Sequence, residues 1–185
     1  MTIGMYSKSL YTYLTENFSQ PEMLNLIEPN DTYIPYEAII TGSYQSEDVS
    51  KYANLKVILV PYTGLNEIDM KLVEDKGIRL FNTHAHSKYV AERGLTLTLG
   101  LLGKLVLYHN GLVRHDWANR FDNNRIQWES LFNKRVGLLG YGHIGKDFHK
   151  LIRPFECEVL AIDRGKEYPD GLTLVSTLHE LIEQC

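Results

Sequence analysis

Residues 135–164, RVGLLGYGHIGKDFHKLIRPFECEVLAIDR, constrain the fold of this chain more than any other segment. A short apolar run at 136–139 leads into GYGHIG at 140–145, which has the spacing G-x-G-x-x-G. Apolar residues at helical spacing follow, and a second apolar run at 159–162 ends at Asp163, 18 residues after the last glycine. The order strand, glycine turn, helix, strand and acid is typical of a dinucleotide-binding βαβ unit.

Each part of this pattern has a physical use. Gly140 permits the tight turn out of the strand, Gly142 lets the backbone approach a pyrophosphate, and Gly145 lets the helix pack close to the strand. The amides of His143 and Ile144 lie at the positive end of the helix dipole and point at the phosphate.

Asp163 is expected to accept hydrogen bonds from the adenosine ribose. A carboxylate at this place repels a 2′-phosphate, so NAD is favoured over NADP as the cofactor, and the neighbouring Arg164 weakens that preference. A glycine-rich turn without a ligand is the alternative, and the complete set of parts disfavours it.

The chain has 185 residues, 44% hydrophobic and 23% charged, with a net charge of −4. This composition fits one globular domain or two small ones and excludes a disordered chain, a collagen-like repeat and a disulfide scaffold. The charge balance argues against nucleic acid and anionic membranes as partners. Two cysteines in a chain of this length indicate a reducing compartment, and no signal peptide pattern precedes the first helix, so a cytoplasmic location is expected.

Short apolar runs alternate with helical patterns upstream of the glycine turn. The segment at 56–61 holds a continuously apolar run, VILV at 57–60, which predicts a strand covered on both faces. Residues 66–76 have helical spacing and end at Gly77, and a further strand is predicted at 78–81. This alternation predicts a parallel sheet with helices on its faces.

A leucine-rich stretch follows at 87–110. Residues 95–99 alternate with period two, as in a strand, but apolar residues also recur at helical spacing, and the length of the stretch favours a helix. Residues 95–107 are too few and too polar to span a membrane, which predicts a buried helix. Three glycines within it indicate close packing: Gly94, Gly100 and Gly103. The polar residues at 114–134 are predicted to form an ordered loop.

Several stretches resemble the NAD-dependent D-isomer-specific 2-hydroxyacid dehydrogenases, a family that includes D-lactate, phosphoglycerate and glycerate dehydrogenases. NLKVILVPYTGLNEID at 54–69 resembles the family's strand and substrate loop, and GIRLFN at 77–82 resembles its next strand. VAE at 90–92 resembles the start of its long interdomain helix, and RHDW at 114–117 resembles its Arg-x-Gly-x-Trp stretch.

The resemblance implies an α/β fold with two domains. Residues 1–86 would form a flavodoxin-like substrate domain, and residues 87–185 would form the long helix and the first part of an incomplete doubly wound (Rossmann) NAD-binding domain. It also implies hydride transfer between NAD and a small 2-oxo or 2-hydroxy acid, and a homodimer formed through the helix at 87–110.

The family also implies roles for individual residues. Backbone amides matching Thr63 and Gly64 hold the substrate carboxylate, those matching His143 and Ile144 hold the pyrophosphate, and the carboxylate matching Asp163 holds the ribose. No metal is expected. His84 and His86 are expected mainly as loop histidines, with a substrate contact or a metal as weaker alternatives. Tyr62 can reach the substrate loop, and Cys157 is expected to be a buried structural thiol.

The sequence also departs from the family pattern. NTHA at 82–85 stands where the family often has Asn-Thr-Pro-Gly, and Gly94 stands where a hydroxyl residue often lies. The family's catalytic Arg, acidic residue and His lie well downstream of the ribose acid, whereas this sequence continues for 22 residues after Asp163. We therefore expect a truncated chain with no catalytic residue and no turnover of its own. A non-catalytic dinucleotide-binding module or an inactive remnant are the alternatives, and the sequence does not select the hydroxy acid.

Overall fold

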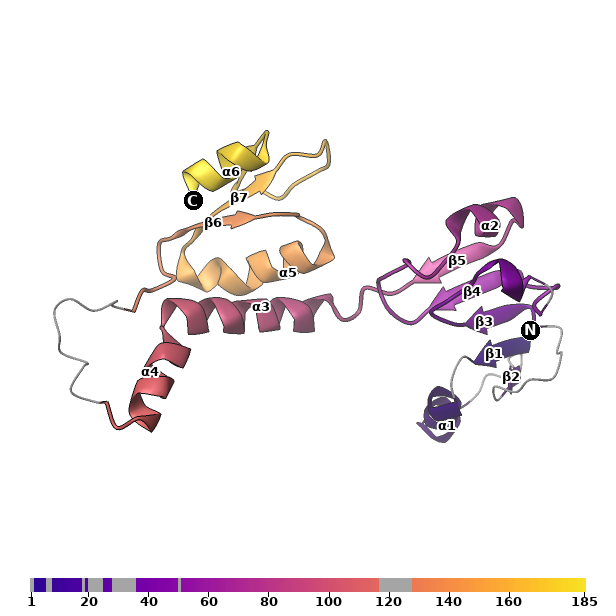
Figure 1. Cartoon of the computed structure of the whole chain (residues 1–185). Coiled ribbons are helices and arrows are strands. Elements are labelled where there is room, and N and C mark those ends of the chain that lie inside the picture. Colours follow the sequence, from indigo (N-terminus) through magenta and orange to yellow (C-terminus); the bar gives the residue numbers. More distant parts are fainter. Residues whose placement is uncertain are drawn as a thin grey trace. The chain divides into compact units, whose positions relative to one another are not determined.

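The chain forms two compact units, residues 1–85 and 86–185, and each is described here by itself. The computed structural model describes residues 2–5, 8–17, 19, 25–27, 36–49, 51–116 and 128–185 (Figure 1). Both units are built on a parallel sheet with helices packed against it, as the alternation of short apolar runs and helical patterns predicts.

The first unit contains a five-stranded parallel sheet with the strand order β2-β1-β3-β4-β5. This is the flavodoxin-like order, so this part of the predicted fold class is confirmed. Its strands are β1 (Thr2–Met5), β2 (Asn25–Ile27), β3 (Ala38–Ile40), β4 (Val57–Val60) and β5 (Arg79–Asn82). Its helices are α1 (Lys8–Asn17), the 3-10 turn η1 (Ser46–Asp48) and α2 (Met70–Asp75).

Strand β4 is covered on both faces, as its continuous apolar run predicts. Ile58 and Val60 pack on one side with Val73 of α2, whereas Val57 packs on the other side with Ile3 of β1 and with the apolar residues of α1. Because successive side chains of a strand point to opposite faces, a run that is apolar throughout supplies both layers of the core.

The second unit contains a three-stranded parallel sheet with the order β6-β7-β8. This is the arrangement of one half of a doubly wound nucleotide fold. Its strands are β6 (Arg135–Leu138), β7 (Glu158–Ile162) and β8 (Leu172–Val175). Its helices are α3 (Ser87–Leu102), α4 (Leu105–Val113), α5 (His143–Ile152), the 3-10 turn η3 (Arg153–Phe155) and α6 (Leu178–Gln184).

Helices cover both faces of this sheet. Val159 of β7 packs with Ile152 of α5 and with apolar residues of α3, and α3 and α5 lie side by side (Figure 1). The next residue, Leu160, is fully buried and packs on the opposite face with Leu181 of α6.

The leucine-rich stretch differs from the prediction in two ways. It forms two helices, because α3 ends at Leu102 with Gly103 as its C-cap, and Lys104 adopts the left-handed conformation (φ 51°). The carbonyl of Leu102 accepts a hydrogen bond from the Glu129 N–H at 2.8 Å, which provides a partner outside the helix at this end. The prediction of a buried helix was also wrong, since Ala91 is the one buried residue of α3 and no residue of α4 is buried. No helix in the described ranges is long and apolar enough to cross a membrane.

One of the three glycines does serve close packing between elements. A Cβ at Gly94 would lie 3.3 Å from a ring atom of Phe148, so α3 and α5 approach closely at this point. A Cβ at Gly100 would meet nothing nearer than 3.9 Å, and Gly103 lies at the break between the helices.

Two features near the C-terminal end complete the second unit. Strand β8 did not follow from the sequence patterns, because LTLV is short and half of it is exposed. Helix α6 is capped by Thr177, whose hydroxyl accepts a hydrogen bond from the Glu180 N–H at 3.1 Å, and the Glu180 carboxylate accepts one from the Ser176 N–H at 2.8 Å. Most of the loop predicted at 114–134 lies outside the described residues.

Candidate dinucleotide and substrate sites

The glycine turn lies directly after the first strand of the second sheet. Gly140 has φ 109°, a left-handed value that favours glycine, and its N–H bonds to the Leu138 carbonyl at 2.9 Å. Gly142 is the N-cap of α5, with φ −86° and ψ −156°. The sequence RVGLLGYGHIG therefore folds as the predicted strand, tight turn and helix start.

The other two glycines have different surroundings. A Cβ at Gly145 would lie 2.5 Å from the Gly140 carbonyl oxygen, so this residue must be glycine for α5 to pack against the turn. A Cβ at Gly142 would have no atom within 4 Å. The space beside Gly142 is therefore open, as it must be if a ligand approaches the backbone there.

The start of α5 presents backbone donors beside this open space. The first N–H groups of an α-helix have no acceptor within the helix, and here the first intrahelical bond runs from the Lys146 N–H to the Gly142 carbonyl at 2.9 Å. Gly142, the N-cap, has no side chain that could accept hydrogen bonds from the first amides of the helix. The turn thus places the amides of His143, Ile144 and Gly145 in the first turn of α5, at the positive end of the helix dipole, where an anion is stabilised.

Asp163 follows the neighbouring strand, β7, at the carboxyl edge of the same sheet. Its N–H bonds to the Val175 carbonyl at 2.8 Å, and its Oδ1 accepts a hydrogen bond from the Gly165 N–H at 2.9 Å. The residue is exposed. Because β6 and β7 are parallel and paired, the glycine turn and this carboxylate share the sheet edge at which ligands of open α/β sheets bind.

The residues of the second unit fit a dinucleotide. The turn offers backbone donors and open space to a pyrophosphate, and Asp163 offers a carboxylate oxygen to a ribose. NAD would be held by the turn through its pyrophosphate and by Asp163 through its adenosine ribose.

Sequence patterns missed a side-chain contact beside the turn. The Tyr141 hydroxyl lies 2.7 Å from His149 Nδ1, and both side chains are half-buried. Burial raises the pKa of Tyr141 above its ordinary value. Burial, together with the nearby Arg153 charge, lowers the pKa of His149 below its ordinary value.

A second polar contact joins the start of α3 to α5. The Ser87 hydroxyl donates a hydrogen bond to the Asp147 carboxylate at 2.6 Å, and the Lys150 ammonium donates another at 3.0 Å. These two bonds, led by that from Ser87, hold the pKa of Asp147 below its ordinary value. The contact fixes the first turn of α3 on the second unit.

The first unit places Thr63 and Gly64 in the loop after β4. The Thr63 hydroxyl donates to the Thr83 carbonyl at 3.0 Å, and the Asn82 amide donates to the Thr63 carbonyl at 2.9 Å. A Cβ at Gly64 would meet no atom within 4 Å, and both residues are exposed. The loop after β4 is therefore tied to the segment after β5, at the carboxyl edge of the first sheet.

The other candidates from the sequence lie in both units. The hydroxyl of Tyr62 lies directly over Gly42, where it fills the position of a Cβ. His86 precedes α3 and its ring lies 6.4 Å from that of Tyr89, and His84 is half-buried. No group of three or more metal-ligating side chains occurs among the residues that the structure describes. The thiol of Cys157 is half-buried and donates to the Leu131 carbonyl at 3.2 Å, and burial raises its pKa.

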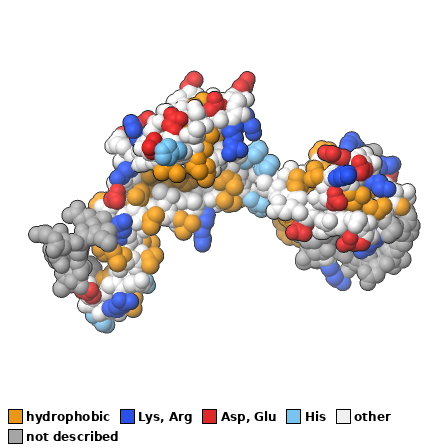
Figure 2. Space-filling model, turned by 45° about the horizontal axis from the view of Figure 1, so that its top comes forward, with side chains coloured by type: hydrophobic (Ala, Val, Ile, Leu, Met, Phe, Trp, Pro, Cys, Tyr) orange, Lys and Arg blue, Asp and Glu red, His pale blue; other side chains and the backbone are white. Residues whose placement is uncertain are grey.

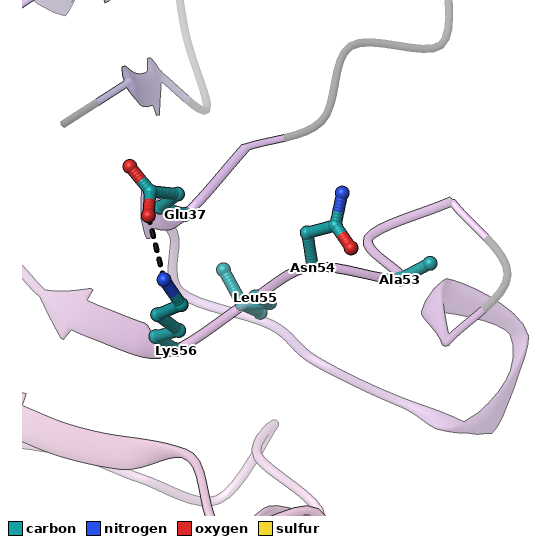
Figure 3. Close-up of a pocket in the computed structure, with 5 residues that line it drawn as sticks. All are labelled: Glu37, Ala53, Asn54, Leu55 and Lys56. Atoms are coloured by element: carbon teal, nitrogen blue, oxygen red, sulfur yellow. Dashed lines mark hydrogen bonds and ion pairs between the residues drawn. The ribbon is translucent and has the colours of Figure 1, made fainter.

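A hollow of about 530 Å³ lies at the opposite edge of the first sheet (Figure 3). It is lined by Glu37 and by residues 53–56, and an ion pair of 2.7 Å joins the Lys56 ammonium to the Glu37 carboxylate. Glu37 and Lys56 each directly precede a strand, so the hollow lies at the amino edge. Since ligands of open parallel sheets bind at the carboxyl edge, this hollow is not the candidate site.

Comparison with known proteins identifies the second unit. Residues 95–185 match the model of the NAD-binding domain of the D-isomer-specific 2-hydroxyacid dehydrogenases. The chain is 26% identical over 157 residues to a hydroxypyruvate reductase of Thermotoga maritima, which covers 84% of this chain and 49% of that protein. It is 28% identical over 173 residues to D-3-phosphoglycerate dehydrogenase of Methanocaldococcus jannaschii, which covers 90% of this chain and 32% of that protein. The chain thus spans 32% to 49% of the length of these relatives.

Solved structures share the fold over the whole chain. D-lactate dehydrogenase of Aquifex aeolicus, solved with NAD and lactic acid, superposes with a TM-score of 0.75 at 21% identity, covering 100% of this chain and 58% of that one. D-2-hydroxyisocaproate dehydrogenase superposes with a TM-score of 0.70 at 25% identity, covering 100% and 60%. The resemblance read from the motifs is therefore confirmed, and the cofactor of this domain is NAD. The chain is thus similar to the NAD-dependent D-isomer-specific 2-hydroxyacid dehydrogenases, and its residues 95–185 match the NAD-binding domain of that family.

Proposed function

We propose that this chain supplies the cofactor-binding turn and the substrate-carboxylate loop for hydride transfer between a 2-hydroxy acid and its 2-oxo acid. NAD, when bound, carries the hydride. The single observation that carries the proposal is the pairing of two features on adjacent parallel strands, the glycine turn with its helix start and the exposed carboxylate of Asp163.

Each candidate residue has a proposed binding role. Gly140, Gly142 and Gly145 shape the turn, and the amides of His143 and Ile144 donate to the pyrophosphate. Asp163 accepts from the ribose hydroxyls, which favours NAD over NADP because its negative charge repels a 2′-phosphate.

The loop after β4 has the matching role for the substrate. The amides of Thr63 and Gly64 are proposed to hold the substrate carboxylate. The bonds from this loop to the segment after β5 fix its position, and the open space at Gly64 leaves room for a small anion. This loop belongs to the proposed substrate domain, residues 1–86, and residues 87–185 form the proposed cofactor domain.

A second candidate function is dinucleotide binding without turnover. It is supported by the kind of groups that have proposed binding roles above. They are backbone amides and the Asp163 carboxylate, which hold a ligand rather than exchange a proton with a carbonyl oxygen. An assay of NADH oxidation with glyoxylate, hydroxypyruvate, pyruvate and phosphohydroxypyruvate separates the two candidates.

We also propose a homodimer formed through α3 and α4. Hydrophobic side chains gather along both helices (Figure 2). Several are more than half exposed: Leu97, Leu101, Leu105, Val106, Leu107 and Val113. An exposed apolar patch of this kind marks an interaction surface. The free thiols, Cys157 and Cys185, support a reducing location such as the cytoplasm.

The test of the cofactor site is NADH binding measured by fluorescence on the whole chain. Asp163→Asn should weaken NADH binding by about 10- to 100-fold, the usual range for losing hydrogen bonds to a charged acceptor. Asp170→Asn is the matched control, because it removes one exposed carboxylate from the same loop. An Asp163→Asn chain that binds NADH as tightly as the control, or an unchanged chain that binds none, contradicts the proposal.

A further inference from the structure

The loop after β7 carries a tyrosine that bonds to the chain on both sides of Asp163. The Tyr168 hydroxyl accepts a hydrogen bond from the Arg164 N–H at 2.8 Å and lies 3.4 Å from the Ile162 carbonyl oxygen, to which it donates. The side chain is half-buried, although the residues from 163 to 167 are exposed. One phenol thus holds the backbone immediately before and immediately after the candidate ribose-binding residue.

This contact matters because few other bonds fix the Asp163 carboxylate. Its N–H continues the pairing with β8, and its Oδ1 accepts from the Gly165 N–H at 2.9 Å. Its Oδ2 makes no hydrogen bond to any residue that the structure describes. The direction of that oxygen therefore depends on the conformation of residues 162–165, where Tyr168 binds.

The same tyrosine connects this loop to the glycine turn. The rings of Tyr168 and Tyr141 lie 5.9 Å apart at an angle of 52°, within the range of favourable aromatic pairs. Tyr141 is in turn bonded to His149 of α5 at 2.7 Å. A continuous set of side-chain contacts therefore runs from α5, through the turn, to the backbone around Asp163.

We propose that Tyr168 is a positioning residue for the cofactor, which holds Asp163 where it accepts hydrogen bonds from the adenosine ribose. The inference rests on the proposed function and extends it to the discrimination between NAD and NADP. A carboxylate at a fixed place both binds the 2′-hydroxyl and repels a 2′-phosphate, and a carboxylate that can turn away does neither well.

The test compares Tyr168→Phe with the unchanged chain. The variant keeps the ring against Tyr141 and removes only the hydroxyl. It should bind NADH about tenfold more weakly, with a smaller loss for NADPH, so that the ratio of the two affinities falls. Tyr89→Phe is the control, because it removes a hydroxyl from an exposed ring on α3 of the same unit. Amide hydrogen exchange gives a readout without cofactor, and the Arg164 amide should exchange faster in Tyr168→Phe.

Each outcome decides the inference. Equal NADH affinity of Tyr168→Phe and the unchanged chain overturns it and leaves the proposed function standing. An equal loss of affinity for NADH and for NADPH shows a general role of Tyr168 in stability and also overturns the inference. No NADH binding by the unchanged chain overturns the proposed function and this inference with it. If the variant does not fold, the unchanged chain decides, since a rapidly exchanging Arg164 amide contradicts the contact itself.

Discussion

Gly145 is the residue at which the structure most sharply limits substitution. In Gly145→Ala the new Cβ would lie 2.5 Å from the Gly140 carbonyl oxygen, and real Cβ atoms do not come within 3.0 Å of such neighbours. The turn and α5 must therefore separate by at least about 0.5 Å. Overpacking of this kind costs about 1–3 kcal/mol of the free energy of unfolding.

A second term works in the opposite direction. Alanine is a better helix former than glycine by about 1 kcal/mol, so Gly145→Ala also gains stability. Gly100→Ala makes the same replacement within α3, where the nearest atom is 3.9 Å from the Cβ. Because both variants share the helix gain, Gly145→Ala should be less stable than Gly100→Ala by about 1–3 kcal/mol.

Urea unfolding followed by tryptophan fluorescence measures this difference. Both tryptophans, Trp117 and Trp128, belong to the second unit, so the signal reports the unit that contains the turn. Gly142→Ala completes the set, because its Cβ meets no atom. It should change the free energy of unfolding by less than about 0.5 kcal/mol and still weaken NADH binding. If Gly145→Ala is as stable as Gly100→Ala, the turn is not packed against α5 as described.

Three other perturbations have expected results. His149 has a lowered pKa in the folded chain, so below about pH 6.5 the unfolded chain binds more protons than the folded chain, and the free energy of unfolding should fall as the pH falls. His149→Asn should reduce the slope of the free energy of unfolding against pH, measured by urea titrations between about pH 7.5 and pH 5. A slope that is the same in both chains would assign the pH dependence to other groups. Ser87→Ala removes the leading hydrogen bond to Asp147 and should raise the pKa of that carboxyl toward its ordinary value, which an NMR titration of the carboxyl carbon detects; an unchanged pKa would contradict the contact. Leu101→Glu places a charge on the exposed face of α3 in both copies of the proposed dimer. Sedimentation velocity should show a dimerisation affinity about 100-fold lower, and an unchanged affinity would place the interface elsewhere.

The sequence predicts those parts of the fold whose backbone geometry is determined by residues close to one another along the chain. The spacing of Gly140, Gly142 and Gly145 specifies a turn, because the positive φ at Gly140 and the close approach at Gly145 are requirements that neighbouring residues impose, whereas Gly142 leaves open space beside the turn. The continuous apolar run of β4 specifies a strand with two covered faces in the same way.

What the sequence does not predict depends on residues that are distant along the chain or on single backbone angles. Helical periodicity continues across Gly103 and Lys104, and the left-handed conformation of Lys104 that separates α3 from α4 leaves no trace in it. The contacts of Tyr141 with His149 and Tyr168 depend on the course of two loops. The exposure of the leucines in α3 and α4 depends on what the rest of the chain covers.

Strand β6 lies at one end of its three-stranded sheet and pairs with β7 alone within the described residues. Within that part of the chain its outer edge is a row of backbone donors and acceptors that pair with no strand, and an edge of this kind can bind another strand. A twofold axis beside that edge would pair two copies of β6 in antiparallel orientation, and such a pairing satisfies both edges at once and stops further growth. A pairing without that symmetry leaves a new open edge and continues into higher aggregates. The symmetry of contacts at this edge thus decides between a closed pair and continued growth.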